Sequence, residues 1–80
     1  MHIIIDRIRE KLLGRYFSTR SELRHLAEGA GFNFVPVEIL TSEDRNAVAV
    51  LRPKGLGEIL VRAERPVAWQ PFHIIAVEAA

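Results

Sequence analysis

The chain has 80 residues and a formal net charge of +1 at pH 7, which is enough length for one small domain over residues 1–80. Charges so nearly balanced argue against a basic nucleic-acid-binding tail and against an acidic mimic of DNA. The absence of cysteine excludes disulfides, thiolate zinc sites and a catalytic thiol.

The N-terminal segment shows no pattern for export or membrane insertion. In MHIIIDRIRE, charged residues follow directly after three isoleucines, so the apolar run is too short for a signal peptide. No apolar run in the chain approaches the ~18 residues that a membrane-spanning helix needs. We therefore expect a cytoplasmic protein without a membrane partner.

Residues 4–13 have the spacing of an amphipathic helix. Apolar side chains recur at helical spacing, at Ile4, Ile5, Ile8 and Leu12. Charged residues fill the opposite side, and Gly14 is suited to end the helix. An alternative interpretation makes residues 3–5 a short strand, with Asp6 capping a shorter helix.

The segment STRSELRHLAEGAG predicts a second helix that begins after Thr19. Thr19 and Glu22 have the spacing of a capping box, in which each side chain binds the main-chain N–H of the other residue. An apolar stripe follows, at Leu23, Leu26, Ala27 and Ala30. Gly29 and Gly31 then mark the end of this helix.

From Phe32 onward the pattern favours strands. The segment FNFVPVEIL is rich in aromatic and β-branched residues, and Pro36 makes it an edge strand or an irregular one. The last segment, FHIIAVEA, is apolar on both faces near its middle, which is typical of an inner strand.

The segments AVAVLR and GEILVRAE predict a hairpin around PKGL. In the expected register Val50 faces Ile59 and Val48 faces Val61, which puts four apolar side chains on one face. In the turn itself Pro53 suits the second position. A phosphate-binding loop is disfavoured, because no serine or threonine follows the lysine and the next segment is a strand.

Together these elements predict an α+β fold. Two N-terminal helices are expected to pack on one face of a three- to four-stranded antiparallel sheet.

Residues that carry catalysis or bind metals give no pattern. The three histidines do not have a metal-ligand spacing, and the carboxylates do not suggest a pair converging across a cleft. Ser18, Thr19 and Ser21 suit a helix start better than a nucleophilic role. We therefore expect no enzymatic activity, no cofactor and no metal.

An alternative fold comes from the segment LAEGAGFNFVPVEIL, which resembles the helix-turn-helix motif of bacterial repressors. The positions that match that motif are Leu26, Ala27, Gly31, Val37 and Leu40. The resemblance implies a winged helix, with Asn33 reading a base edge and with Arg52 and Lys54 of the hairpin wing on DNA phosphates. The alternation over residues 34–41 favours a strand instead.

Aromatic residues suggest a protein-binding surface. Trp69 lies between two prolines in RPVAWQPF, and tryptophan and arginine are the residues that anchor interfaces most often. The residues predicted to contact a partner are Trp69, Phe72, Tyr16, Arg62 and Arg65. The alternative is that these rings cover a small core.

The leading functional hypothesis is a small interaction module, of the accessory or inhibitory kind that bacteria and phages make. It would bind a larger protein or nucleoprotein complex, or form a homodimer, and an exposed sheet edge offers a second route to a partner. The alternatives are the winged-helix DNA-binding regulator, with nucleic acid as partner, and an enzyme subunit whose site needs other chains.

Overall fold

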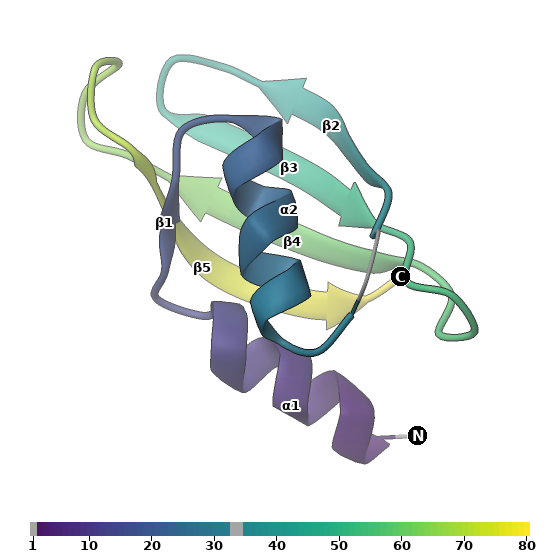
Figure 1. Cartoon of the computed structure of the whole chain (residues 1–80). Coiled ribbons are helices and arrows are strands. Elements are labelled where there is room, and N and C mark those ends of the chain that lie inside the picture. The colour runs from purple at the N-terminus through teal and green to yellow at the C-terminus, as the bar shows by residue number, and fades with distance from the viewer. Residues whose placement is uncertain (1, 33–34) are drawn as a thin grey trace.

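The computed structural model of the chain describes residues 2–32 and 35–80. Within them the elements are α1 (His2–Leu12), β1 (Tyr16–Phe17), α2 (Arg20–Gly29), β2 (Val37–Ser42), β3 (Asn46–Leu51), β4 (Ile59–Glu64) and β5 (Phe72–Ala79). The strands form one antiparallel sheet in the order β1-β5-β4-β3-β2 (Figure 1). The α+β class is therefore as predicted, but the described residues form five strands instead of three or four.

The additional strand is β1, which lies between the two helices in the chain. It has two residues, and Tyr16 pairs with His73 while Phe17 pairs with Phe72. Its position at the outside of β5 makes β5 an inner strand at its first two residues, so the prediction of an inner strand holds there and not over the apolar middle of β5.

α2 lies across one side of the sheet, and α1 lies below β5 in the view of Figure 1, so the predicted packing of both helices on one face is only roughly matched. α2 contacts the two edge strands, β1 and β2, and the sheet curls around it, whereas α1 contacts β5 and α2. No helix among the described residues is long and apolar enough to cross a membrane.

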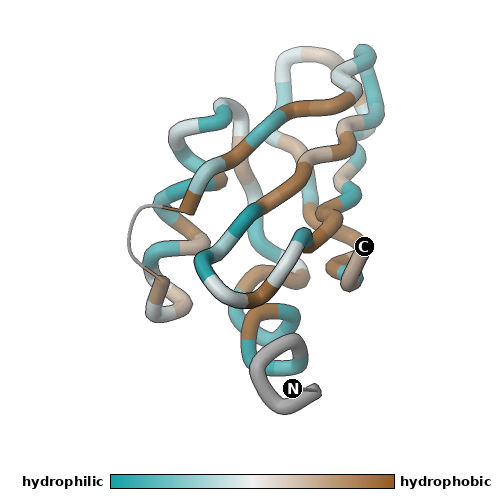
Figure 2. The backbone as a smooth tube through the Cα atoms, turned by 90° about the vertical axis from the view of Figure 1, so that its right-hand side faces the viewer, coloured by the Kyte–Doolittle hydropathy of each residue, from teal (hydrophilic) through white to brown (hydrophobic). Residues whose placement is uncertain are grey.

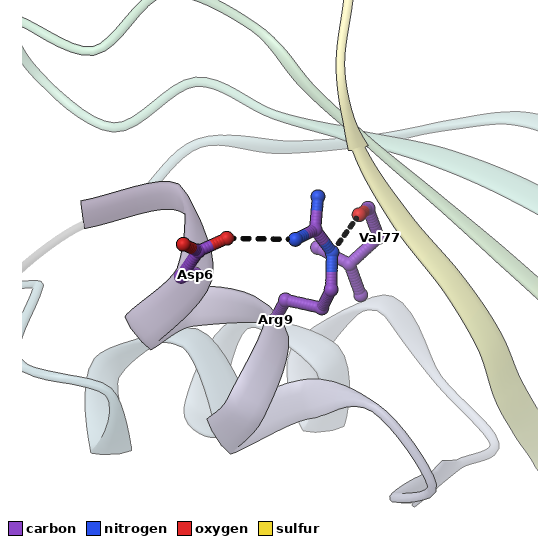
Figure 3. A network of polar contacts seen from close by, with 3 residues as sticks. All are labelled: Asp6, Arg9 and Val77. Carbon is purple, nitrogen blue, oxygen red and sulfur yellow. Dashed lines mark hydrogen bonds and ion pairs between the residues drawn. The ribbon is translucent and has the colours of Figure 1, made fainter. Parts of the chain in front are cut away.

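α1 is a continuous helix, so the interpretation of residues 3–5 as a strand was wrong. Ile8 and Leu12 are buried as the spacing predicted, whereas the side chains of Ile4 and Ile5 lie outside the described part. On the same helix, Arg9 donates hydrogen bonds to the Asp6 carboxylate and to the Val77 carbonyl of β5 (Figure 3).

The start of α2 confirms the predicted cap, with one difference. Thr19 Oγ1 accepts a hydrogen bond from the Glu22 N–H at 3.2 Å, as expected. The Glu22 carboxylate instead accepts from the N–H of Ser18, one residue before Thr19, at 3.3 Å. Leu23 and Ala27, from the predicted stripe, are buried in the core.

The register of the central hairpin differs from the predicted one by one residue. Leu51 pairs with Ile59 and Ala49 pairs with Val61, so Val48 and Val50 lie on the opposite face from the one expected. The prediction failed because alanine and valine alternate in β3, and both faces of such a strand are apolar. The helix-covered face therefore takes Ala47, Ala49 and Leu51 of β3, and the valines face away from the helices.

The shift arises between the turn of this hairpin and β4, where two residues separate Leu56 from Ile59 and only one separates Leu51 from Pro53. The N–H of Leu56 donates to the carbonyl of Pro53 at 3.2 Å, which makes Pro53 the first residue of the turn instead of the second. Gly55 and Gly57 have φ angles of +82° and +73°, a region that favours glycine. Glycine is thus required twice in this loop for its backbone conformation.

The winged-helix fold is not found. Residues 37–42 form strand β2, where the resemblance required a recognition helix. The strand begins later than the predicted residue 32, and residues 33–34 lie outside the described part.

The core lies between the helices and one face of the sheet. Leu12, Leu23, Ile59 and Val61 are all 0% exposed, and they come from α1, α2 and β4. In Figure 2 the hydrophobic stretches run along the strands, while the turns at their ends are mostly hydrophilic. The opposite side of the sheet has no helix over it, and we call it the open face.

Candidate interaction surface

The connection between β4 and β5 presents the single tryptophan of the chain to solvent. The N–H of Gln70 donates to the carbonyl of Val67 at 3.2 Å, which closes a turn with Trp69 at its third position. Trp69 is 82% exposed, more than any other large hydrophobic residue in the described part. The interpretation that this ring covers the core was therefore wrong.

Arg65 fixes the base of this loop. Its Nε donates to the Asp44 carbonyl at 2.6 Å, and its Nη1 donates to the Gln70 carbonyl at 3.3 Å. Its guanidinium also lies over the Phe72 ring, 4.0 Å from the centroid. These contacts join the Trp69 loop to the turn between β2 and β3, so the exposed ring is carried by a braced loop.

A hollow of about 580 Å³ lies beside the loop, at this end of the open face. Tyr16 and His73 contribute a stacked pair of rings, with centroids 4.8 Å apart and planes inclined by 21°. The rest of the lining comes from the prolines of the loop and from polar and charged side chains, at Arg45, Asn46, Glu64, Arg65 and Gln70. We call Trp69, Tyr16, His73 and this hollow the aromatic end of the molecule.

The aromatic end contains His73 where the predicted surface had Phe72. Phe72 is 4% exposed and its ring packs against Phe17, with centroids 5.6 Å apart, so its assignment to a partner contact was wrong. Successive residues of a strand point to opposite faces, so His73, the half-buried neighbour of Phe72, lies on the open face instead. The alternation of β5 could have placed His73 on the face opposite to Phe72 and Ile74.

Arg62 is exposed at the centre of the open face. It lies on the middle strand, β4, and its cross-strand neighbours are Val48 and Ala76. Arg65, in contrast, is half-buried, and its guanidinium donates a hydrogen bond to the Gln70 carbonyl of the Trp69 loop. Of the five predicted contact residues, Trp69, Tyr16 and Arg62 are therefore on the surface.

Of the residues predicted to contact nucleic acid, the structure describes Arg52 and Lys54. Arg52 forms ion pairs with Glu38 at 2.8 Å and Glu58 at 2.9 Å. Hydrogen bonds to these two carboxylates raise the pKa of Arg52 further above its ordinary value. Lys54 is exposed at the hairpin tip, and Asn33 lies outside the described residues. Because Arg52 already pairs with two carboxylates, Lys54 is the positive charge of this loop that remains for a phosphate.

Within residues 2–32 and 35–80, no three histidine or carboxylate side chains lie together so that they could hold a metal ion. Two smaller hollows of about 210 Å³ each lie at α2, one lined by Arg20 and Arg24 and the other by Lys11 and Arg15.

Comparison of the chain with protein-family models, with curated proteins and with solved structures finds no match.

Proposed function

We propose that this chain is a small non-enzymatic interaction module that binds a larger protein or nucleoprotein complex, or its own copy, through the aromatic end. The observation that carries the proposal is the 82% exposed ring of Trp69 on a loop that Arg65 braces. A ring held in place before binding loses less conformational freedom when a partner covers it. Tryptophan is also enriched among the few residues that supply most of the free energy of an interface.

The expected loss of affinity when Trp69 is truncated is that of a large aromatic anchor. An aromatic side chain buries about 150–250 Å² in an interface. Truncating such an anchor typically costs about 2–4 kcal/mol of binding free energy. This corresponds to a loss of affinity of roughly 30- to 1,000-fold.

The hollow favours a partner of mixed chemistry. Its lining contains the paired rings of Tyr16 and His73 and charged side chains of both signs, from Arg45, Arg65 and Glu64. An aromatic or proline-bearing loop with a polar flank suits such a lining better than a phosphate backbone does. Binding should therefore depend weakly on salt, in contrast to the steep salt dependence of the alternative function, binding to DNA.

Capture of partners from the native host tests the proposal. Wild-type protein and the Trp69→Ala and Leu13→Ala variants are immobilised in parallel, and the retained proteins are compared. Leu13 is the matched control because it is 46% exposed and lies after α1, away from the loop. The proposal predicts a partner retained by wild type and Leu13→Ala and lost with Trp69→Ala. Equal retention by all three proteins would contradict it.

A titration with duplex DNA at low and high salt distinguishes the proposed function from the alternative, which is binding to DNA. Salt-sensitive binding to DNA that survives Trp69→Ala would favour the nucleic-acid function over the proposed one.

A further inference from the structure

The open face carries an apolar band with charges at its centre. Val48, Leu60 and Ala76 are half-buried there, on β3, β4 and β5. At each side of the band, a residue at a register shift adds exposed apolar area: Leu40 in β2 is 49% exposed and Ile75 in β5 is 46% exposed. This band extends from one side of the sheet to the other.

Two opposite charges interrupt the band on the middle strand. Arg62 and Glu64 are two positions apart in β4, so both side chains project from the open face, about 7 Å apart along the strand. The cross-strand neighbours of Arg62 are Val48 and Ala76, and those of Glu64 are Asn46 and His73. Neither charge therefore faces an opposite charge across the sheet.

A partner that covered this band would have to compensate both charges. Burying an unpaired arginine or glutamate is costly, so the covering surface needs a carboxylate over Arg62 and a cation over Glu64. It also needs these two groups at the same separation along its own surface.

A second copy of the open face meets this requirement. Consider two sheets that stack around a two-fold axis lying between them, perpendicular to the strands and level with Ala63. Arg62 of each copy then lies over Glu64 of the other. The two pairs are equivalent, as in the isologous interfaces of C2 dimers, which are the commonest oligomers. The charge pattern of β4 is thus complementary to itself.

The size of the face is adequate. The molecule measures 35 × 20 × 19 Å and has an accessible surface of 5318 Å². A stable interface buries about 800 Å² per partner, which one broad side of this molecule can supply.

We propose that two copies of this chain form a two-fold dimer, open face against open face, held in register by reciprocal Arg62–Glu64 pairs. The inference rests on the proposed function in that it names a second copy as one partner of the module. It uses the open face, including Glu64 at the border of the hollow, and its reciprocal charge pairs do not involve Trp69.

Sedimentation equilibrium of the purified full chain over micromolar to millimolar concentrations tests the dimer. Wild type should dimerise, whereas Arg62→Glu and Glu64→Arg should each raise the dissociation constant at least tenfold, because like charges then face each other. The double variant should recover the wild-type dissociation constant. An equimolar mixture of the two single variants should form a heterodimer, since both of its charge pairs are restored.

Arg24→Glu and Glu10→Arg are matched controls, because they make the same charge changes at exposed positions of the helices. They should leave the dissociation constant unchanged. A wild-type protein that stays monomeric at every concentration, or single variants that do not dimerise when mixed, would overturn the dimer. If partner capture that depends on Trp69 persists in that case, the proposed function stands and this inference alone fails.

Discussion

Arg9 of α1 donates a hydrogen bond from Nε to the main-chain carbonyl of Val77 in β5, over 3.0 Å and across 68 positions of the chain (Figure 3). The bond occupies an acceptor on the outer side of β5. β1 is only two residues long and pairs with the start of β5, so it ends before reaching Val77. An arginine of α1 therefore continues the protection of a sheet edge that the short strand leaves open.

Replacing Arg9 by alanine should lower the free energy of unfolding by about 1 to 2 kcal/mol, because a carbonyl loses a charged donor. Asp6→Ala is the control, since it breaks only the exposed ion pair with Arg9, and such pairs contribute at most about 1 kcal/mol. Urea denaturation of the two variants makes the comparison. An equal loss in both would contradict a stabilising role for the Arg9–Val77 bond.

The capping box of α2 predicts a second stability effect. Thr19→Ala removes the oxygen that accepts the Glu22 N–H and should cost about 1 kcal/mol, whereas Thr19→Ser keeps that oxygen and most of the stability. Thermal unfolding followed by circular dichroism measures both variants. If serine destabilised the protein as much as alanine, the contribution of the hydroxyl would be refuted.

Replacing glycine by alanine should change the free energy of unfolding in opposite directions at two positions. Gly55→Ala places a side chain at a φ of +82° and should destabilise the protein by about 1 to 2 kcal/mol. Gly29→Ala, at the end of α2, meets no atom within 4 Å and requires no positive φ, so it should stabilise by up to about 1 kcal/mol. The denaturant midpoints of the two variants measure these changes in stability. A Gly55→Ala variant as stable as wild type would show that the hairpin does not need this conformation.

The bracing of the Trp69 loop by Arg65 can be measured directly. In Arg65→Ala the loop loses its hydrogen bonds to the Asp44 and Gln70 carbonyls, so the indole should rotate more freely. Time-resolved fluorescence anisotropy should show a larger fast component than in wild type. The Arg62→Ala variant, which removes an arginine of the open face, should match wild type, and equal behaviour of the two variants would contradict the brace.

Local sequence patterns were sufficient for the elements with strong signals. The cap at Thr19 and the extent of β5 followed from residue spacing and alternation, because both depend only on neighbouring residues. β1 was missed because two residues are too few to show any period.

The register of β3 and the exposure of the aromatic residues depend on longer-range structure. The alternation of alanine and valine in β3 fits either face, and the one additional residue between the turn and β4 decides between them. Nothing in the sequence distinguished the burial of Trp69 from that of Phe72. The packing of Phe72 between Phe17 and Arg65, which come from distant parts of the chain, determines which ring is buried.

The fluorescence of Trp69 tests the proposed interaction most directly, because it is the only tryptophan in the chain. In the dilute free protein the emission maximum should lie at the long wavelength of a hydrated indole, as expected for a ring that is 82% exposed. Titration with the captured partner should shift the emission to shorter wavelength, with a midpoint at the dissociation constant. Saturating binding that leaves the emission unchanged would contradict the account, because Trp69 would then lie outside the interface.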